Sequence, residues 1–269
     1  MLREEFIELK GTNKADCRLD LAVIVPTLNE RESLPELVEG LKKTLQGLNW
    51  ELIIVDDDSP DGTAEVVREL ALNDQRIRLI HRIGRRGLSS ACIDGMMATD
   101  SACIAVMDAD LQHDESLLPI MMKRLHFEDL DLVVATRNAD GGSMGTLTAS
   151  RVLLSRFGQR IGHAIVRCQL TDPMSGFFML RRELFVEVAR GLRGKGFKIL
   201  LDIITSSRRP LKIGEAGYRF RPRQYGTSKL NVIVGLEFLA MILSKRIDGL
   251  HLTRLLGLVS SVDASPENS

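Results

Sequence analysis

Two aspartates and a glutamine follow a short apolar run near the middle of the chain, and their oxygen atoms are of the kind that binds hard cations. The run from Ala102 to Met107 is typical of a buried strand in a parallel sheet. Alternation along an extended chain places Asp108, Asp110 and Gln112 on one face beyond that strand. Such a set suits Mg²⁺ or Mn²⁺, held together with substrate phosphates. Acidic residues can also simply end a strand, so this motif alone does not decide the question.

Polar clusters also follow two other predicted strands. Three adjacent carboxylates at residues 56–58 repel one another unless they accept hydrogen bonds or bind a cation. We expect Asp57 to contact a ligand, whereas Asp61 is expected to form a turn that leads into a helix. The segment 26–30 ends the first strand. Three polar strand ends in one sheet favour a ligand site over ordinary turns.

Basic side chains in the second half of the chain are suited to phosphate groups. Arg137 follows a predicted strand, and Arg151 and Ser155 share one face of a predicted helix. Arg223 and Lys229 flank a glycine-containing loop of the kind that folds over a bound diphosphate. The alternative is a solvated basic loop without a ligand.

The hydrophobic pattern predicts the elements that position these side chains. The expected strands are residues 21–25, 51–55, 77–81, 103–107, 131–135 and 176–180. The expected helices are residues 33–45, 63–72, 88–97, 115–125, 148–166 and 232–243. Alternation of strand and helix predicts an α/β fold with a doubly wound, mainly parallel sheet flanked by helices. Ligands of such sheets bind beyond the carboxyl ends of the strands.

Charge and composition exclude several other classes of protein. Residues 1–149 hold 27 acidic and 16 basic side chains, whereas residues 150–269 hold 9 acidic and 20 basic ones. This difference fits a protein in which an acidic, metal-binding half faces a basic half that binds phosphates or lies near anionic lipid. Uneven charge without a function is the alternative. The chain lacks the glycine motifs of P-loop and dinucleotide-binding proteins. Aromatic residues make up 4% of the chain, so no nucleic-acid partner is expected. Four scattered cysteines indicate reduced thiols in the cytoplasm.

The order of the motifs resembles that of inverting glycosyltransferases of family 2, which have a GT-A fold. The matching stretches are PTLNE at 26–30, VDDDSPDGT at 55–63, DADLQH at 108–113, TDPMSGFF at 171–178, GFKILL at 196–201 and YGTSKL at 225–230. They are most similar to those of enzymes that transfer mannose to a dolichyl or other polyprenyl phosphate. The resemblance implies a Rossmann-like glycosyltransferase domain at residues 20–230. Residues 1–19 are polar and irregular and are expected to form a loose leader.

The resemblance also implies a role for individual residues. The donor nucleotide would bind to Pro26, Leu28, Glu30, Val55, Asp57, Asp108, Ala109, Asp110, Arg223 and Lys229. The metal ligands would be Asp108, Asp110 and Gln112. The acceptor phosphate would bind to Arg137, Arg151 and Ser155, and the catalytic residues would be Asp110 and Arg137.

The expected reaction is transfer of mannose from GDP-mannose to a polyprenyl phosphate. A phosphate monoester is anionic at neutral pH, so it needs no general base, whereas a hydroxyl acceptor would need one such as Asp172. One alternative is a UDP-glucose-dependent polyprenyl-phosphate glucosyltransferase, or another family 2 enzyme with a hydroxyl acceptor. Another is a catalytically silent nucleotide-binding module that recruits a membrane partner.

A lipid acceptor would bring the chain to a membrane. No apolar stretch reaches the length of about 18–20 residues that spans a bilayer. Residues 231–260 are expected to form C-terminal amphipathic helices that contact a membrane or a second subunit, followed by a disordered tail at residues 261–269. We therefore expect peripheral binding at the cytoplasmic face of a membrane, directly or through a membrane-anchored partner.

Overall fold

A seven-stranded sheet forms the centre of the part of the chain that the computed structural model describes. The described residues are 19–136, 170–173, 175–194, 196, 198–218 and 221. The strands are β1 (Leu21–Thr27), β2 (Trp50–Asp56), β3 (Ile77–His81), β4 (Cys103–Val106), β5 (Leu132–Thr136), β6 (Phe178–Arg181) and β7 (Ile213–Gly217). Their order across the sheet is β3-β2-β1-β4-β6-β5-β7. The predicted α/β fold is therefore confirmed.

The sheet is parallel except at β6. Strands β1 to β4 pair in parallel, as do β5 and β7, whereas β6 lies antiparallel between β4 and β5. The sequence predicted a strand at 176–180, but β6 begins two residues later. Strands β1 and β2 are buried along their whole length, which explains their continuous apolar sequences.

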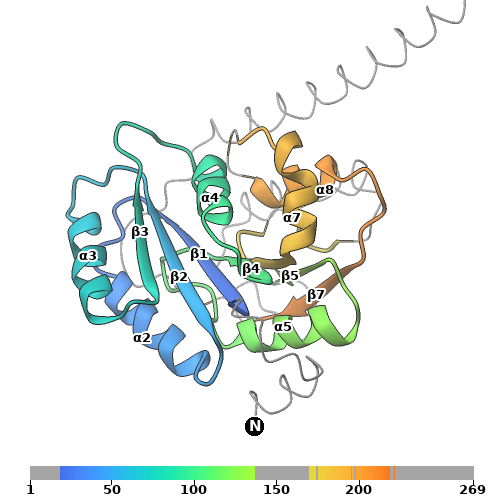
Figure 1. Ribbon diagram of the computed structural model, residues 1–269, viewed down its shortest axis with the longest axis horizontal. Coiled ribbons are helices and arrows are strands. Elements are labelled where there is room, and N and C mark those ends of the chain that lie inside the picture. The colour runs from blue at the N-terminus through green and yellow to red at the C-terminus, as the bar shows by residue number, and fades with distance from the viewer. Residues whose placement is uncertain are drawn as a thin grey trace, which may run out of the picture. The chain divides into compact units, whose positions relative to one another are not determined.

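Helices cover both faces of the sheet (Figure 1). One face carries α2 (Leu34–Thr44), α3 (Thr63–Asn73) and α5 (Leu117–Phe127). The other carries α4 (Leu88–Met97), α7 (Arg182–Val188) and α8 (Ile199–Ser206). The sequence analysis did not predict α7, α8 or β7. Its helix at 115–125 begins two residues later than expected because Asp114 accepts hydrogen bonds from Ser116 in a turn before the helix.

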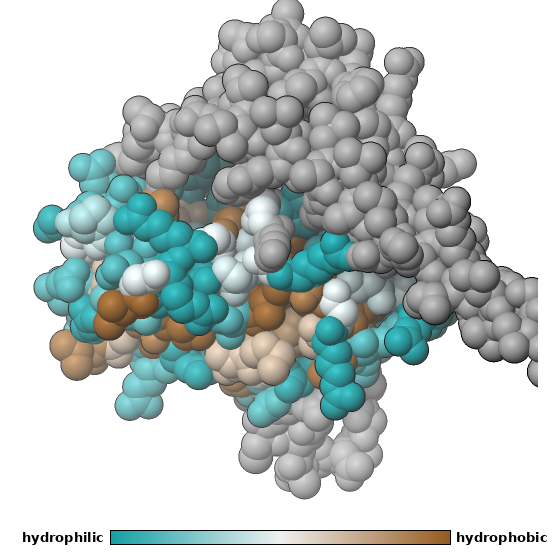
Figure 2. Space-filling model, turned by 90° about the horizontal axis from the view of Figure 1, so that it is seen from above, coloured by the Kyte–Doolittle hydropathy of each residue, from teal (hydrophilic) through white to brown (hydrophobic). Residues whose placement is uncertain are grey.

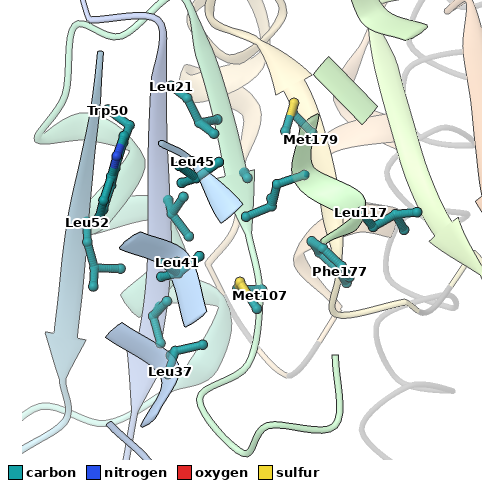
Figure 3. Close-up of a cluster of buried hydrophobic side chains, with 14 of the residues drawn as sticks. Leu21, Leu37, Leu41, Leu45, Trp50, Leu52, Met107, Leu117, Phe177 and Met179 are labelled. Carbon is teal, nitrogen blue, oxygen red and sulfur yellow. The ribbon is translucent and has the colours of Figure 1, made fainter. Parts of the chain in front are cut away.

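The core on the first face is built from regularly spaced leucines. Leu37, Leu41 and Leu45 recur every four residues and face the sheet, where Trp50 and Leu52 lie (Figure 3). Each of these five residues is at most 2% exposed. This packing fixes β1 and β2 side by side, so their carboxyl ends meet.

The surface of the described part shows both hydrophilic and apolar side chains in the view of Figure 2. Ile83, Leu72 and Phe127 are among the exposed large apolar residues. No helix in the described ranges is both long and apolar enough to cross a membrane. The predicted helices at 148–166 and 232–243, the leader and the tail lie outside the described residues.

Candidate active site

The carboxyl ends of β1, β2 and β4 bring the predicted site residues to one edge of the sheet. Pro26 pairs with Val55 in the register of β1 and β2. The backbone N–H of Asp57 donates to the carbonyl oxygen of Thr27 at 3.0 Å. The N–H of Met107 donates to Ile24 at 3.1 Å, so Asp108 follows at the same edge. The prediction that the three polar clusters meet is therefore confirmed.

The Asp-x-Asp segment does not stay extended beyond β4, contrary to the expected alternation. Leu111 has a φ of 62°, a left-handed conformation that bends the chain. The carboxylate of Asp110 accepts a hydrogen bond from the backbone N–H of Gln112 at 3.1 Å, which closes a turn. Asp110 is 6% exposed and the side chain of Asp108 is 41% exposed. The two carboxylates therefore reach the edge of the sheet through a turn, and Ala109 is buried between them.

The carboxylate of Asp108 lies against a glycine from a distant segment. A Cβ atom at Gly176 would be 3.1 Å from one oxygen of Asp108 and 3.4 Å from the other. Gly176 therefore leaves room beside this carboxylate that any other residue would fill. The two stretches DADLQH and TDPMSGFF thus form parts of the same site.

These residues fit a hard divalent cation. Carboxylate oxygens are the ligands that Mg²⁺ and Mn²⁺ prefer, and the half-exposed Asp108 is accessible from solvent. No group of three His, Cys, Asp or Glu side chains suited to a metal occurs in the described part. Binding of an ion by the two carboxylates and Gln112 stays a prediction, and such a site would share the ion with a substrate phosphate, in the manner typical of Mg²⁺.

The carboxylates of the site act on a thiol in α4. Burial raises the pKa of the Cys92 thiol, and the charges of Asp108 and Asp57 raise it further. Cys92 is 1% exposed, so its thiol is a buried, unreactive group.

The three carboxylates after β2 are each held by hydrogen-bond donors of the protein. The fully buried Asp56 accepts hydrogen bonds from Thr27 and from the backbone N–H and hydroxyl of Ser59. Asp58 contacts His81 and accepts the N–H of Gly84. Mutual repulsion of the acids is thus offset by donors of the protein itself.

Asp57 is paired on both oxygens. One oxygen accepts a hydrogen bond from the guanidinium of Arg82 at 2.6 Å, and the other accepts the backbone N–H of Gly87 at 2.6 Å. Burial raises the pKa of Asp57, whereas the Gly87 N–H and the charge of Arg82 lower it. Contact between this residue, which is 6% exposed, and a nucleoside remains a prediction.

Arg82 is a buried cation that the sequence analysis missed. Its side chain is 3% exposed, forms ion pairs with Asp57 and Asp94, and donates to Ser90 at 2.6 Å and to the carbonyl of Gly87. It therefore links the end of β2 to the start of α4. Arg82 directly follows β3. Its position at the end of a third strand was the only feature of the sequence that could have indicated a role in the site.

The first polar segment is tied to the turn before α3. The N–H of Glu30 donates to the hydroxyl of Thr63, and Asp61 accepts hydrogen bonds from Thr63 and from the N–H of Arg31. The structural role predicted for Asp61 is therefore confirmed. Leu28 and Glu30 are both half-buried at this end of the sheet.

Gln112 connects the acidic motif to the chain that leads into the basic loop. Its carbonyl accepts the N–H of Arg221 at 3.0 Å, and its side-chain amide donates to the carbonyl of Arg221 at 3.2 Å. The guanidinium of Arg221 pairs with Asp114 and Glu115, both at 2.9 Å. Arg221 belongs to the basic group around the predicted loop, but its pairing with two acidic side chains was not predicted.

Five predicted site residues lie outside the described residues. They are Arg137, Arg151, Ser155, Arg223 and Lys229. The chain reaches the first of them directly after β5 and reaches Arg223 two residues after Arg221. Their roles stay predictions.

A family model described as glycosyl transferase family 2 matches residues 22–188, which is more than half of the chain. The chain belongs to glycosyl transferase family 2. The matched region of this family 2 enzyme contains the polar ends of β1, β2 and β4.

Three curated relatives of this family 2 enzyme are named dolichol-phosphate mannosyltransferase. The protein from Pyrococcus furiosus is 37% identical over 226 residues, which cover 83% of this chain and 63% of the relative. The proteins from Mycosarcoma maydis and Saccharomyces cerevisiae are 33% and 32% identical, over 82% and 83% of this chain and 77% and 86% of their own lengths. The chain thus spans less than two thirds of the length of the archaeal relative and more than two thirds of the length of each fungal relative.

Solved structures of glucosyl-3-phosphoglycerate synthase from Mycobacterium tuberculosis share the fold. The complex with Mn²⁺, UDP-glucose and phosphoglyceric acid has a TM-score of 0.65 at 18% identity and covers 90% of this chain and 82% of that one. The complex with phosphoglyceric acid has a TM-score of 0.63 at 21% identity and covers 90% and 83%. The predicted GT-A fold of this family 2 enzyme is confirmed.

Proposed function

We propose that the protein transfers mannose from GDP-mannose to a dolichyl or other polyprenyl phosphate, with inversion at the anomeric carbon. The observation that carries this proposal is the similarity to relatives named dolichol-phosphate mannosyltransferase over four fifths of the chain. The meeting of three polar strand ends at one edge of the sheet supports it.

The donor nucleoside is held in this proposal by the ends of β1 and β2. Pro26, Leu28 and Glu30 contribute the first wall, and Val55 and Asp57 the second. The register pairing of Pro26 with Val55 supports this assignment because the two residues are neighbours in the sheet. The carboxylate of Asp57 is oriented by Arg82 and Gly87 before any ligand binds.

The diphosphate of the donor lies at the turn after β4. Asp108, Asp110 and Gln112 hold a Mg²⁺ or Mn²⁺ ion, which when bound offsets the charge that develops on the departing GDP. The presence of Mn²⁺ in the structural neighbours supports a divalent ion. Arg223 and Lys229 add positive charge to the same phosphates.

The acceptor phosphate attacks directly. Arg137, Arg151 and Ser155 bind it, and one phosphate oxygen forms the new bond to the anomeric carbon while the bond to the oxygen of GDP breaks. The electron pair of the broken bond leaves with GDP. Because the acceptor attacks from the face opposite GDP, the configuration of the anomeric carbon is inverted once. No proton has to be removed from the acceptor, since the second pKa of a phosphate monoester is about 6. Asp172 is therefore not required as a base.

A lipid acceptor requires the protein to work at a membrane surface. In this proposal residues 20–230 are the catalytic domain, and residues 231–260 are the segment that contacts the membrane surface or a membrane-anchored partner. The catalytic domain then works peripherally at the cytoplasmic face.

Competition between nucleotides tests the donor. The assay measures transfer of labelled sugar to a short polyprenyl phosphate with Mn²⁺, from GDP-mannose and in parallel from UDP-glucose. We expect mannosyl lipid from GDP-mannose and inhibition by GDP rather than UDP. Preferential use of UDP-glucose would contradict the mannose assignment, and nucleotide binding without release of GDP would point to a silent binding module.

A further inference from the structure

His113 lies directly behind the exposed carboxylate of Asp108. The ring nitrogen Nδ1 of His113 accepts a hydrogen bond from the backbone N–H of Asp108 at 3.1 Å. The ladder of β4 ends at Val106, and the N–H of Met107 makes the last backbone bond to β1. The histidine therefore supplies the acceptor for the next N–H along the chain, at the point where the sheet no longer provides one.

The ring of His113 is fixed by two aromatic side chains. It stacks on Phe177, with ring centroids 5.2 Å apart, and meets the edge of Tyr218 at 5.9 Å. His113 is 4% exposed. Phe177 directly follows Gly176, which borders the carboxylate of Asp108. The same short segment therefore positions both the ring and the carboxylate.

The hydrogen bond also determines which nitrogen of the ring carries the proton. Because Nδ1 accepts, the proton of the neutral ring is on Nε2. Nε2 lies 3.7 Å from the oxygen Oδ2 of Asp108, so the ring presents an N–H edge toward the carboxylate. The ring thus contacts both the backbone and the side chain of one residue.

We propose that His113 is a positioning residue that holds Asp108 in the orientation required to bind the divalent ion. This inference rests on the proposed function only in taking Asp108 as a metal ligand. Groups that orient metal ligands typically change metal affinity by 10–100-fold when they are removed. The active part of His113 is the acceptor at Nδ1, and the aromatic stack keeps that acceptor in place.

Two substitutions separate the acceptor from the ring. His113→Asn keeps an acceptor oxygen near the position of Nδ1 but loses the stack, whereas His113→Phe keeps a ring but loses the acceptor. His126→Phe is the matched control, since His126 lies on α5 and contacts Cys103 rather than the site. The dissociation constant of Mn²⁺ is measured by electron paramagnetic resonance in the presence of GDP, with thermal unfolding recorded for each variant.

We expect His113→Phe to weaken Mn²⁺ binding by about 10–100-fold, His113→Asn by much less, and His126→Phe not at all. Equal Mn²⁺ affinity in all variants, or an equal loss in both His113 variants, would overturn the inference. Failure of the unmutated chain to bind Mn²⁺ would instead refute the metal site of the proposed function, and this inference with it.

Nitrogen-15 NMR of the unmutated protein gives a test that does not depend on the folding of any variant. We expect the Nδ1 of His113 to have the chemical shift of an unprotonated nitrogen and Nε2 that of a protonated one. The opposite tautomer would overturn the inference, because a protonated Nδ1 cannot accept the N–H of Asp108.

Discussion

Arg82 carries a positive charge in the interior, next to the carboxylates that follow β2. Its guanidinium connects Asp57, which directly follows β2, with Asp94 and Ser90 in α4. A buried ion pair contributes little compared with apolar packing, but the loss of one partner leaves the other charge buried alone. The stability of this corner of the site therefore depends on Arg82 more than on any exposed ion pair.

Replacement of Arg82 is expected to destabilise the fold. Arg82→Met leaves Asp57 buried without its cation and should lower the free energy of unfolding by about 3–5 kcal/mol. Arg85→Met is the control, since Arg85 also pairs with Asp94 but is 59% exposed, and it should cost at most about 1 kcal/mol. Urea unfolding measures both, and equal effects would contradict the role assigned to Arg82.

Gly176 is expected to be required for metal binding. Its φ is not among the positive values, so Gly176→Ala adds no backbone strain but places a methyl group 3.1 Å from Asp108. We expect Mn²⁺ affinity to fall by about 10–100-fold, as for other changes that displace a metal ligand. At Gly191 an added Cβ meets Ser206 only at 3.5 Å, so Gly191→Ala is the control. Unchanged Mn²⁺ binding by Gly176→Ala would place the ion away from Asp108.

At the scale of elements, α4 lies unusually close to the sheet. A Cβ at Gly95 would overlap the side chain of Ile24 on β1 and would lie 3.0 Å from Val55 on β2. Gly95→Ala therefore forces the helix away from β1 and β2, which carry the proposed nucleoside site, and it should cost about 1–3 kcal/mol of stability. Thermal unfolding tests this, and a stabilised variant, as expected for alanine in an ordinary helix, would contradict it.

The start of α8 makes stability depend on pH. Burial lowers the pKa of Lys198, the residue before α8, to about 7. An unfolded lysine stays protonated to about pH 10. Between these values the unfolded chain binds more protons than the folded one, so this residue makes stability rise as the pH increases through that window.

Removal of Lys198 should flatten this dependence. Lys198→Met is expected to raise the melting temperature near pH 6 and to reduce its increase between pH 7 and pH 10. Lys212→Met, at a lysine that pairs with Asp129 at the surface, is the control. An identical pH profile of the unmutated protein and Lys198→Met would show that the lysine is solvated in the folded state.

At the scale of the whole molecule, the carboxyl edge of the sheet could be predicted from sequence because β1, β2 and β4 are short apolar runs that end in polar residues. The antiparallel position of β6 could not be predicted, because the sequence of this four-residue strand does not indicate the direction in which it pairs. Strand β7 contains two glycines and α7 has seven residues, so neither has a strong periodic signal.

One part of the site that sequence did not predict is local: the turn at Leu111 replaces an expected extended segment. The other parts depend on long-range contacts, such as the stack of His113 on Phe177, which joins two motifs that are distant in the chain. The ion pairs of Arg82 and Arg221 likewise join separate elements. Residue types indicate which chemistry is available, whereas the folded chain decides which side chains face a ligand and which hold their neighbours.

The most direct test of the proposed activity is a mannosyl-transfer assay that compares the unmutated protein with variants in the acidic motif. The unmutated protein, Asp108→Asn and Asp110→Ala are incubated with labelled GDP-mannose, dolichyl phosphate and increasing Mn²⁺, and lipid-linked mannose is measured. We predict Mn²⁺-dependent product with inverted configuration from the unmutated protein alone. Product from either variant at the unmutated rate, or transfer unaffected by a chelator, would contradict the account of the site.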